Sequence, residues 1–532
     1  MDLQQHDGCR PVVSEHRAGR TPRRGYDGPG PRRLRRLLGT TIAVVVLARL
    51  VHAGLPLRPD EGGYLLIARH WAPGSGEFLY GDYHVDRPPL LMLFFRWAAL
   101  WDSDAAIRLI AVPVVVAAVL AVAASGRLIG GHVAAVWSGV VAGALLCSPA
   151  LASDQADGEL FAVAFVAGSV LLALRAGRAT ATRSALAWTF GAGVLAASAT
   201  LVKQNFVDGI VFLGVLVLAR SARDRQAAPS TAATCIVALA GLATTYVLAL
   251  VWLSSAGADL SQIASELAGF RGAALEAILG SSLHAPARRA VTLVVLATVS
   301  AMLPIAWVWV RWLRHRRGGP DPEQWALVAL LGCGVLGVLL GGSYWPHYLQ
   351  QLVPGIALGA GVVIAEGGRA ARRMRVLARA SVASAAVATA GTVAVYALVP
   401  SVSSPQQVGT WLAHSSHGGD TAVVTYGHPQ ILEQADLASP YPYLWSLQMR
   451  TLDERQQRLR QTLRGPDAPT WVVQVTTLDA WDIDRDGALR RLLADRYRHV
   501  ADVCGYPVLL RVGVDRDLAE VPSCGTGGAW PG

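Results

Sequence analysis

The sequence has little charge for its length. Only 16% of its 532 residues are charged, whereas 53% are hydrophobic, and the mean hydropathy is +0.38. A soluble protein carries about 25% charged residues, so this composition excludes an ordinary soluble chain. Several apolar runs reach the roughly 20 residues that cross the hydrocarbon core of a bilayer. The composition therefore indicates a polytopic membrane protein.

Lysine is nearly absent. Lys203 is the single lysine, and the other 46 basic residues are arginines, a bias that a GC-rich genome explains. The net charge of +10 would suggest a nucleic-acid partner in a soluble protein. Here the arginines gather in alternate connections between apolar runs, as they do in the cytoplasmic loops of membrane proteins. We therefore expect no nucleic-acid partner.

Several common chemical motifs are also missing. The chain has no Gly-rich nucleotide loop, no zinc-ligand spacing and no nucleophile elbow. The run DIDRDG from Asp482 begins like a calcium loop, but Leu493 stands where an EF-hand needs Glu. We therefore interpret this run as a polar turn that caps a helix.

The order of polar and apolar segments predicts three regions. Residues 1–36 read as a disordered, basic cytoplasmic tail, 37–400 as the membrane domain, and 401–532 as a small soluble domain. We expect about eleven transmembrane helices, the first over 37–55. The others are expected over 104–124, 132–150, 158–175, 184–202, 205–220, 230–254, 289–311, 325–342, 349–366 and 379–399.

The charges of the connections predict the orientation. Alternate connections are rich in arginine, and by the positive-inside rule they and the N-terminus face the cytoplasm. An odd number of spans then places residues 401–532 outside. There, strands are predicted over 421–427, 470–478 and 506–513, and helices over 452–463 and 487–500, which suggests an α/β domain. A disulfide between Cys504 and Cys524 is plausible in that location.

The first outer loop, residues 57–103, carries two short apolar helical patterns with charges between them. The pair Asp60 and Glu61 begins the first pattern, and Asp86 and Arg87 precede the second. An acid at a helix start is ordinarily a cap, but charge this close to a membrane span is costly and often functional. Arg87, beside a helix N-terminus, either binds a phosphate or extends to lipid headgroups.

Three further outer positions carry candidate groups. Asp157 and Glu159 stand at the mouth of a span in a turn without basic residues. Lys203, between two apolar runs, needs an anion, either a lipid phosphate or Asp208. At another junction lie His347 and Tyr348, which an interfacial aromatic belt explains equally well.

Five segments, in this order, resemble those of the GT-C glycosyltransferases of the family 39 type: RPDEGGYLLIA, DRPPLL, DGELFAV, LVKQ and PHYLQQLVPGIALGAG. That family includes the protein O-mannosyltransferases and the aminoarabinose transferases of lipid A. Each motif is loose, and their order makes the match specific. The resemblance covers about residues 38–400. It implies an all-α polytopic membrane protein of GT-C type, to which residues 401–532 add a small extracytoplasmic α/β domain.

The resemblance also implies a function. The donor would be a sugar linked to polyprenyl phosphate, and the acceptor a glycan, lipid or protein on the outer face of a bacterial plasma membrane. Asp60 would be the general base that activates the acceptor hydroxyl, with Glu61 supporting it, and a direct displacement would invert the sugar carbon. Arg87 would hold the donor phosphate, where the family commonly has lysine, and Lys203 would assist.

The remaining candidates would line the substrate site: Asp86, Asp157, Glu159, His347 and Tyr348. This chemistry requires no cofactor, and we assign no metal ligand, although the outer acid cluster could hold a divalent cation. Membrane lipids are the other expected partners. The alternative function is that of a transporter or lipid flippase, which would place paired charges within the bilayer on broken helices. Here most charges gather at the outer surface, which favours the glycosyltransferase.

Overall fold

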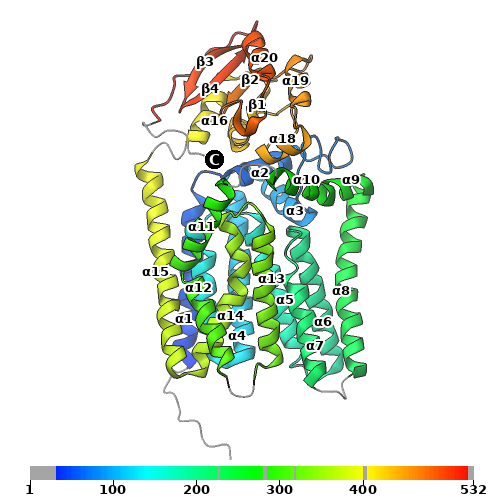
Figure 1. The fold of residues 1–532 in the computed structure, drawn as a ribbon, viewed down its shortest axis with the longest axis vertical. Coiled ribbons are helices and arrows are strands. Elements are labelled where there is room, and N and C mark those ends of the chain that lie inside the picture. Colours follow the sequence, from blue (N-terminus) through cyan, green and yellow to red (C-terminus); the bar gives the residue numbers. More distant parts are fainter. Residues whose placement is uncertain (1–30, 224–227, 280–283, 317–318, 400–403, 525–532) are drawn as a thin grey trace, which may run out of the picture.

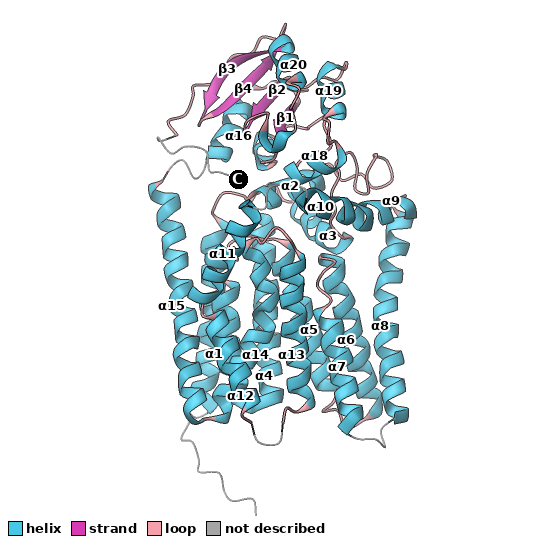
Figure 2. Ribbon diagram, in the orientation of Figure 1, coloured by secondary structure: helices cyan, strands magenta, loops and turns pink. Residues whose placement is uncertain are grey.

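The computed structural model describes residues 31–223, 228–279, 284–316, 319–399 and 404–524. A bundle of long helices carries a small α/β domain at one end (Figures 1 and 2). Short helices lie between the bundle and the domain. The prediction for residues 1–36 lies mostly outside the described residues, and residues 31–36 form the first turns of α1.

Within the described residues, seven helices are long and apolar enough to cross a membrane, or eight if the bent pair α11–α12 counts as one span. The multi-span fold class is thereby confirmed. The bundle contains α1 (Pro31–Ala53), α4 (Ala106–Leu146), α5 (Gly158–Ala176), α6 (Thr182–Val202), α7 (Asp208–Arg223), α8 (Ala228–Ser255), α11 (His284–Val299), α12 (Met302–Arg314), α13 (Pro322–Leu340), α14 (Val353–Glu366) and α15 (Gly368–Leu398).

The helix α4 is a hairpin and supplies two spans. Its direction reverses at Gly130 and Gly131, where Gly131 has a φ of +74°, which L-residues rarely adopt. A Cβ on Gly139 would lie 3.2 Å from that of Ala123, so the two legs pack closely against one another. Both legs of α4, the bent pair, and α1 and α7, which are shorter or more charged than those seven helices, bring the described residues to helices at all eleven predicted positions.

Two predicted spans differ in shape. The span expected over 289–311 is broken into α11 and α12, which meet at 68° beside Ala301, a residue with a φ of +65°. The helix of the last span begins at Gly368 rather than 379, because the basic segment before the apolar run continues the same helix. An arginine-rich segment outside the bilayer can be helical, so hydropathy alone misplaces this boundary.

The two ends of the bundle differ in charge. The end away from the domain carries the arginines of the helix ends and short connections, among them Arg175, Arg178, Arg220, Arg223, Arg311, Arg314 and Arg316 (Figure 1). The domain-bearing end carries α2 (Pro59–Arg69), α3 (Pro89–Ala98), α9 (Leu260–Ala264), α10 (Phe270–Leu279) and the short 3₁₀ helices η1 (Pro149–Leu151) and η4 (Pro346–Leu352). The two short helices expected in the first outer loop are α2 and α3.

The C-terminal domain has a four-stranded sheet in the order β1-β2-β4-β3. The strand β1 (Ala422–Thr425) pairs in parallel with β2 (Trp471–Gln474), which pairs antiparallel with β4 (Tyr506–Arg511), and β4 pairs antiparallel with β3 (Tyr497–Val503). Its helices are α16 (Ser404–Ser415), α17 (Gln430–Ala435), α18 (Ser446–Leu452), α19 (Gln457–Arg464) and α20 (Ala488–Arg496).

One predicted helix of this domain is too long. The helix expected over 487–500 ends at Arg496, and the following residues form β3. The local sequence is compatible with a helix or a strand, and pairing with β4 stabilises the strand. The prediction for the segment from Asp482 is confirmed, because the Asp484 carboxylate accepts hydrogen bonds from the backbone N–H groups of Leu489 (2.8 Å) and Arg490 (3.0 Å) and caps α20.

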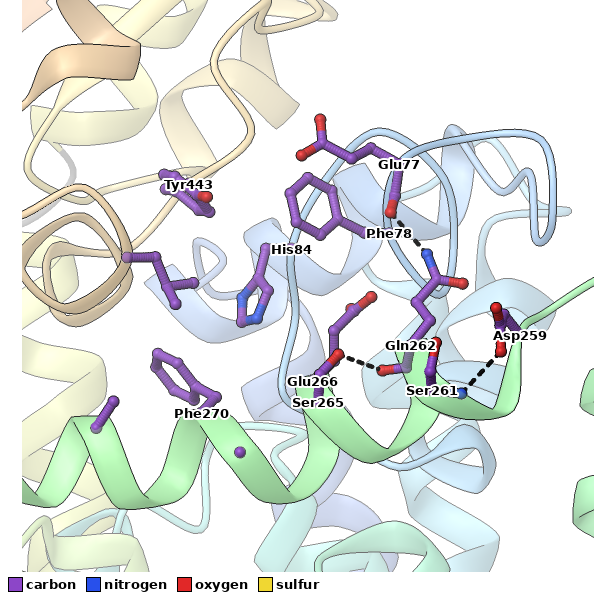
Figure 3. Close-up of a pocket in the computed structure, with 13 residues that line it drawn as sticks. Glu77, Phe78, His84, Asp259, Ser261, Gln262, Ser265, Glu266, Phe270 and Tyr443 are labelled. Carbon is purple, nitrogen blue, oxygen red and sulfur yellow. Dashed lines mark hydrogen bonds between the residues drawn. The ribbon is translucent and has the colours of Figure 1, made fainter.

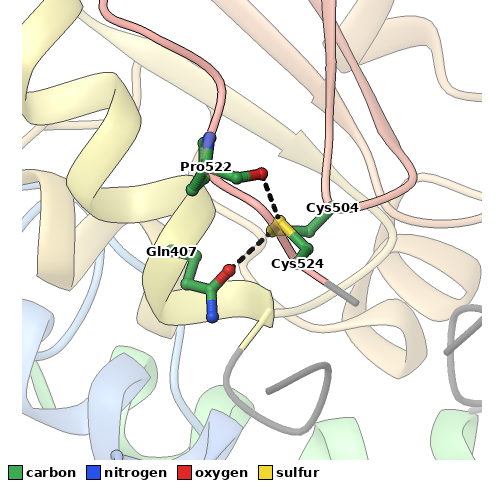
Figure 4. Close-up of a disulfide and its surroundings, with 4 residues drawn as sticks. All are labelled: Gln407, Cys504, Pro522 and Cys524. Atoms are coloured by element: carbon green, nitrogen blue, oxygen red, sulfur yellow. Dashed lines mark hydrogen bonds between the residues drawn. A yellow bond between two sulfur atoms is a disulfide. The ribbon is translucent and has the colours of Figure 1, made fainter. Parts of the chain in front are cut away.

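The disulfide between Cys504 and Cys524 is present (Figure 4). It joins the turn between β3 and β4 to the segment that follows β4. Gln407, on α16, and Pro522 lie beside it. The bond therefore holds the end of the described chain against the sheet and its neighbouring helix.

Candidate active site

Asp60 lies at the N-terminus of α2, where the bundle meets the C-terminal domain. Pro59 occupies the first helical position, and the half-buried Asp60 carboxylate points toward the domain. Its Oδ1 accepts a hydrogen bond of 2.9 Å from the indole Nε1 of Trp445. Its Oδ2 has no hydrogen-bond partner within the described residues. One oxygen is thus held in place while the other is free to accept a proton.

The neighbouring Glu61 is fully buried and fully paired. Its carboxylate forms a two-point ion pair with Arg108, at 2.8 Å to Nε and 2.6 Å to Nη2. It also accepts the backbone N–H groups of Arg58 (3.0 Å) and Ala156 (2.8 Å). Burial favours the neutral acid, but Arg108 and these hydrogen bonds outweigh burial and lower the pKa of Glu61. Glu61 therefore joins three segments of the chain rather than offering a free oxygen.

The two glycines that follow the acid pair allow the domain to approach α2. A Cβ on Gly62 would lie 2.5 Å from that of Gln430, and one on Gly63 would lie 2.3 Å from the Trp445 ring. Both contacts are far shorter than packed carbon atoms allow, so a side chain at either glycine would push the domain away. Trp445 can reach Asp60 because Gly63 leaves room for its indole.

Asp86 and Arg87 form a charge cluster with a third residue. Arg87 Nη1 lies 2.7 Å from Asp86 Oδ1, and Arg271 Nη2 lies 3.0 Å from Asp86 Oδ2. Gln204 joins the same group, donating to the Asp86 carbonyl (3.0 Å) and accepting from Arg271 (3.0 Å). Burial opposes ionisation of Asp86, but the two guanidinium groups prevail and lower its pKa.

Arg271 was not among the predicted site residues. Its signal in the sequence was weak: an arginine in a connection assigned to the arginine-poor side of the membrane. Its place beside Asp86 depends on α10 lying flat over the end of the bundle (Figure 1).

A second cluster gathers Asp157, Glu159, Lys203 and His347. Lys203, the residue that follows α6, is ion-paired with Glu159 and lies 5.0 Å from the centre of the Tyr348 ring. His347 lies 3.6 Å from both Asp157 Oδ2 and Glu159 Oε1. Asp157 caps α5 through Oδ1, which accepts the Leu160 N–H at 3.2 Å. The predicted residues of three separate connections therefore meet in one place.

Asp208, named as the alternative partner of Lys203 to a lipid phosphate, does not pair with it. Asp208 accepts a hydrogen bond of 2.7 Å from Gln351, and Lys203 pairs with Glu159 instead. Asp208 is near in sequence, whereas the packing of α5 against α6 brings Glu159 to the lysine.

The two clusters and Asp60 are close enough to interact electrostatically. Burial disfavours the charged form of Arg87, but Asp86 and, more weakly, Asp60 and Glu159 raise the pKa of this guanidinium above its ordinary value. The Arg87 guanidinium also lies 5.5 Å from the centre of the Tyr64 ring on α2. The site thus combines a carboxylate with a free oxygen and several cations at one end of the bundle.

Part of the second cluster fits a divalent cation. One ligand atom each of Asp157, Glu159 and His347 lies within 4.8 Å of the others. Carboxylate oxygens and imidazole nitrogens are common ligands of divalent metals. Asp157 Oδ2 is buried without a hydrogen-bond partner in the described part of the chain, so it is available as a ligand. Lys203 already balances part of the charge of Glu159.

Comparison with known proteins assigns the fold. No protein-family model matches the sequence, and no curated protein matches it. The crystal structure of ArnT from Cupriavidus metallidurans bound to undecaprenyl phosphate is similar over 91% of this chain and 99% of that chain, with 14% identity and a TM-score of 0.59. The Archaeoglobus fulgidus oligosaccharyltransferase in complex with Zn and sulfate matches 86% of this chain and 71% of that chain, with 14% identity and a TM-score of 0.51.

Both similar structures are GT-C glycosyltransferases, so the chain has the GT-C fold that the sequence resemblance implied. At 14% identity the likeness concerns the fold. Which residues of this chain act on a substrate has to be argued from their chemistry.

Proposed function

We propose that the protein is a membrane glycosyltransferase that moves a sugar from a polyprenyl-phosphate donor to an acceptor on the side of its C-terminal domain. The similar ArnT structure contains undecaprenyl phosphate. The site described above has the groups that such a transfer needs, a carboxylate with a free oxygen and cations beside it. Asp60, with Oδ1 held by Trp445 and Oδ2 free, is the observation that carries the proposal.

The distribution of arginine supports the orientation. The arginine-rich connections lie at the end away from the domain, where Arg220 pairs with Glu323 and Arg316 with Asp321. By the positive-inside rule that end faces the cytoplasm. The active site and the C-terminal domain then face outward, where lipid-linked donors serve envelope synthesis in a bacterial plasma membrane.

Asp60 acts as the general base in this proposal. Its carboxylate takes the proton of an acceptor hydroxyl while that oxygen attacks the anomeric carbon of the donor sugar. The bond between this carbon and the phosphate oxygen breaks, and its electron pair leaves with the lipid phosphate. Attack from the face opposite the phosphate inverts the anomeric carbon.

Arg87 and Arg271 would stabilise the departing phosphate. The Asp86 carboxylate holds both guanidinium groups, at 2.7 Å and 3.0 Å, and so orients them without using all of their donors. Cations already oriented where negative charge develops lower the barrier at little cost in reorganisation. Arginine, with a planar fork of donors, suits a phosphate in this position.

The second cluster would line the donor side of the site. Lys203, His347 and Tyr348 would contact the phosphate or the sugar, and Asp157 and Glu159 would orient them. A divalent cation bound by Asp157, Glu159 and His347 would supply a further positive charge for the phosphate. The ion pair of Glu61 with Arg108 would keep α2, and hence Asp60, in place.

The test is to replace the base and a matched acid in the same loop. Purified Asp60→Asn and Asp82→Asn proteins in nanodiscs would be given radiolabelled polyprenyl-phosphate sugars and envelope extract from a deletion strain. Asp82 is exposed and therefore serves as the control. We expect Asp60→Asn to lose about 10²–10⁴-fold in transfer rate and Asp82→Asn to keep the wild-type rate. Full transfer by Asp60→Asn would exclude Asp60 as the base.

A further inference from the structure

A cavity of about 640 Å³ lies between the first outer loop, the α9–α10 segment and the C-terminal domain (Figure 3). Its volume is within the roughly 300–1,000 Å³ of small-molecule sites. None of the predicted site residues lines it. We infer that this cavity is a subsite for a neutral saccharide of the acceptor, an assignment that rests on the proposed glycosyl transfer.

Aromatic rings form much of the cavity wall. The centroid of the His84 imidazole lies 5.1 Å from that of the Phe270 ring, 5.5 Å from that of Phe78 and 6.1 Å from that of Tyr443. Figure 3 shows these rings on opposite sides of the cavity, with Phe270 on the α10 side and Tyr443 on the side of the domain. The C–H faces of a sugar ring are apolar and pack well on aromatic rings, while its hydroxyl groups need polar partners between them.

Two buried polar groups of the cavity lack partners. Glu266 accepts the Leu79 N–H at Oε1 (2.9 Å), but its Oε2 is buried with no hydrogen bond in the described residues. The same holds for Nδ1 of His84, whose residue is 3% exposed. Leaving such groups unpaired costs free energy, so both are suited to a ligand that brings hydrogen-bonding groups into the cavity.

The charge state of these groups favours neutral hydroxyls. Burial raises the pKa of Glu266 to about 8 and lowers the pKa of His84 to about 4, so both are uncharged near pH 7. A neutral carboxyl group donates one hydrogen bond and a neutral imidazole can accept one. At the rim, Glu77 is ion-paired with Arg458, whose guanidinium lies over the Phe78 and Tyr443 rings. No unpaired cation among the described lining residues would hold a phosphate.

The cavity adjoins the proposed active site through three short connections. Phe270 precedes Arg271, which pairs with Asp86. Tyr443 lies two residues before Trp445, which holds Asp60. His84 lies two residues before Asp86. An acceptor glycan with one sugar in the cavity would therefore extend its next sugar, with the reacting hydroxyl group, toward Asp60. The donor would approach from the bundle.

The exposed rim argues that the ligand enters from the aqueous side. Two exposed residues line the cavity here: Asp259, just before α9, and Ser261, on α9. The Asp259 carboxylate accepts the Ser261 N–H at 2.8 Å and fixes this edge. A lipid-linked donor would come from the apolar bundle, so this entrance fits an acceptor glycan better.

The experiment measures glycan binding apart from transfer. The full chain in nanodiscs would be applied to an array of neutral oligosaccharides of glucose, mannose, galactose and arabinose. We expect retention on at least one of them, a loss of at least tenfold with Glu266→Ala and with Phe270→Ala, and wild-type retention with Glu266→Gln, which keeps a donor and an acceptor. His499→Ala, on the exposed face of the domain, is the matched surface control and should bind as the wild type does.

Two outcomes would overturn the assignment. One is that no neutral oligosaccharide is retained, or that Glu266→Ala and Phe270→Ala retain it as the wild type does. The other is that these variants lose binding of a polyprenyl-phosphate sugar and not of free glycans, which would assign the cavity to the donor. Because Asp60 does not line the cavity, Asp60→Asn should bind the glycan normally, and this separates failure of the subsite from failure of the proposed transfer.

Discussion

Neutralising Glu61 should lower the stability of the protein, whereas neutralising the adjacent Asp60 should leave stability unchanged and abolish transfer. The change Glu61→Gln keeps the shape of the side chain but leaves the buried Arg108 guanidinium without its counter-charge. Breaking a buried ion pair costs about 3–5 kcal/mol. Arg108 also donates to the carbonyls of His52 (2.9 Å) and Pro56 (2.9 Å), so its charge keeps some partners and we expect about 3 kcal/mol, the lower end of that range.

The assay is thermal inactivation of the purified protein. Aliquots are heated, and the monodisperse fraction is measured by size-exclusion chromatography with tryptophan fluorescence, which the 16 tryptophans make sensitive. Glu61→Gln should lower the midpoint temperature clearly, and Arg108→Met should lower it similarly. The double variant should lose less than the sum, because the two residues form one interaction.

The control in the same turn of helix is Asp60→Asn. Its amide oxygen can still accept the Trp445 N–H, and the residue is half-buried, so its midpoint should match the wild type. The reasoning would be refuted if Glu61→Gln melted with the wild type, or if Asp60→Asn lost as much stability. Either result would contradict the assignment of a structural role to Glu61 and a chemical role to Asp60.

Three further changes test other parts of the structure. Gly63→Ala should reduce transfer more than it reduces the melting midpoint, because its Cβ would displace the Trp445 ring at 2.3 Å; equal transfer rates would contradict this contact. Cys504→Ser should destabilise the C-terminal domain by about 3 kcal/mol, because the disulfide closes a loop with a sequence separation of 20 residues. Limited proteolysis measures this loss, and the double variant with Cys524→Ser should be no less stable than Cys504→Ser alone. The raised pKa of Glu266 means that stability is greatest below its ordinary value of 4.5 and falls as the pH rises to about 8. Glu266→Gln should therefore match the wild type at pH 4 and melt higher at pH 9.

Much of the membrane part could be predicted from the sequence. The hydrocarbon core requires about 20 apolar residues per span, and unpaired backbone polar groups there are too costly for anything but helices or closed barrels. These local requirements predict α5, α6 and α13 nearly to their observed ends. The charged loop between α1 and α4, with Asp60 and Arg87, could be recognised because charge near a bilayer is rare enough to be informative.

Errors arose where a choice depended on distant residues. Tyr497–Val503 became β3 because β4 offered it hydrogen bonds, although the preceding helix could have continued. The bend at Ala301 between α11 and α12 precedes Pro304, in the first turn of α12, and a proline at that place is compatible with either a kinked helix or a broken one. In both places the local sequence permits more than one conformation, and packing selects one.

The sequence by itself determined the membrane class, the positions of the spans, the side on which the arginines gather, and the candidate acids of the outer loops. These depend on local composition along the chain, because the bilayer requires about 20 apolar residues per span and makes charge near it costly. Only the tertiary structure decided which acid is free and which is paired, because Asp60 and Glu61 are alike as local sequence. Trp445, Arg108, Arg271 and Glu159 reach their partners from far along the chain, and the fold alone brings them there.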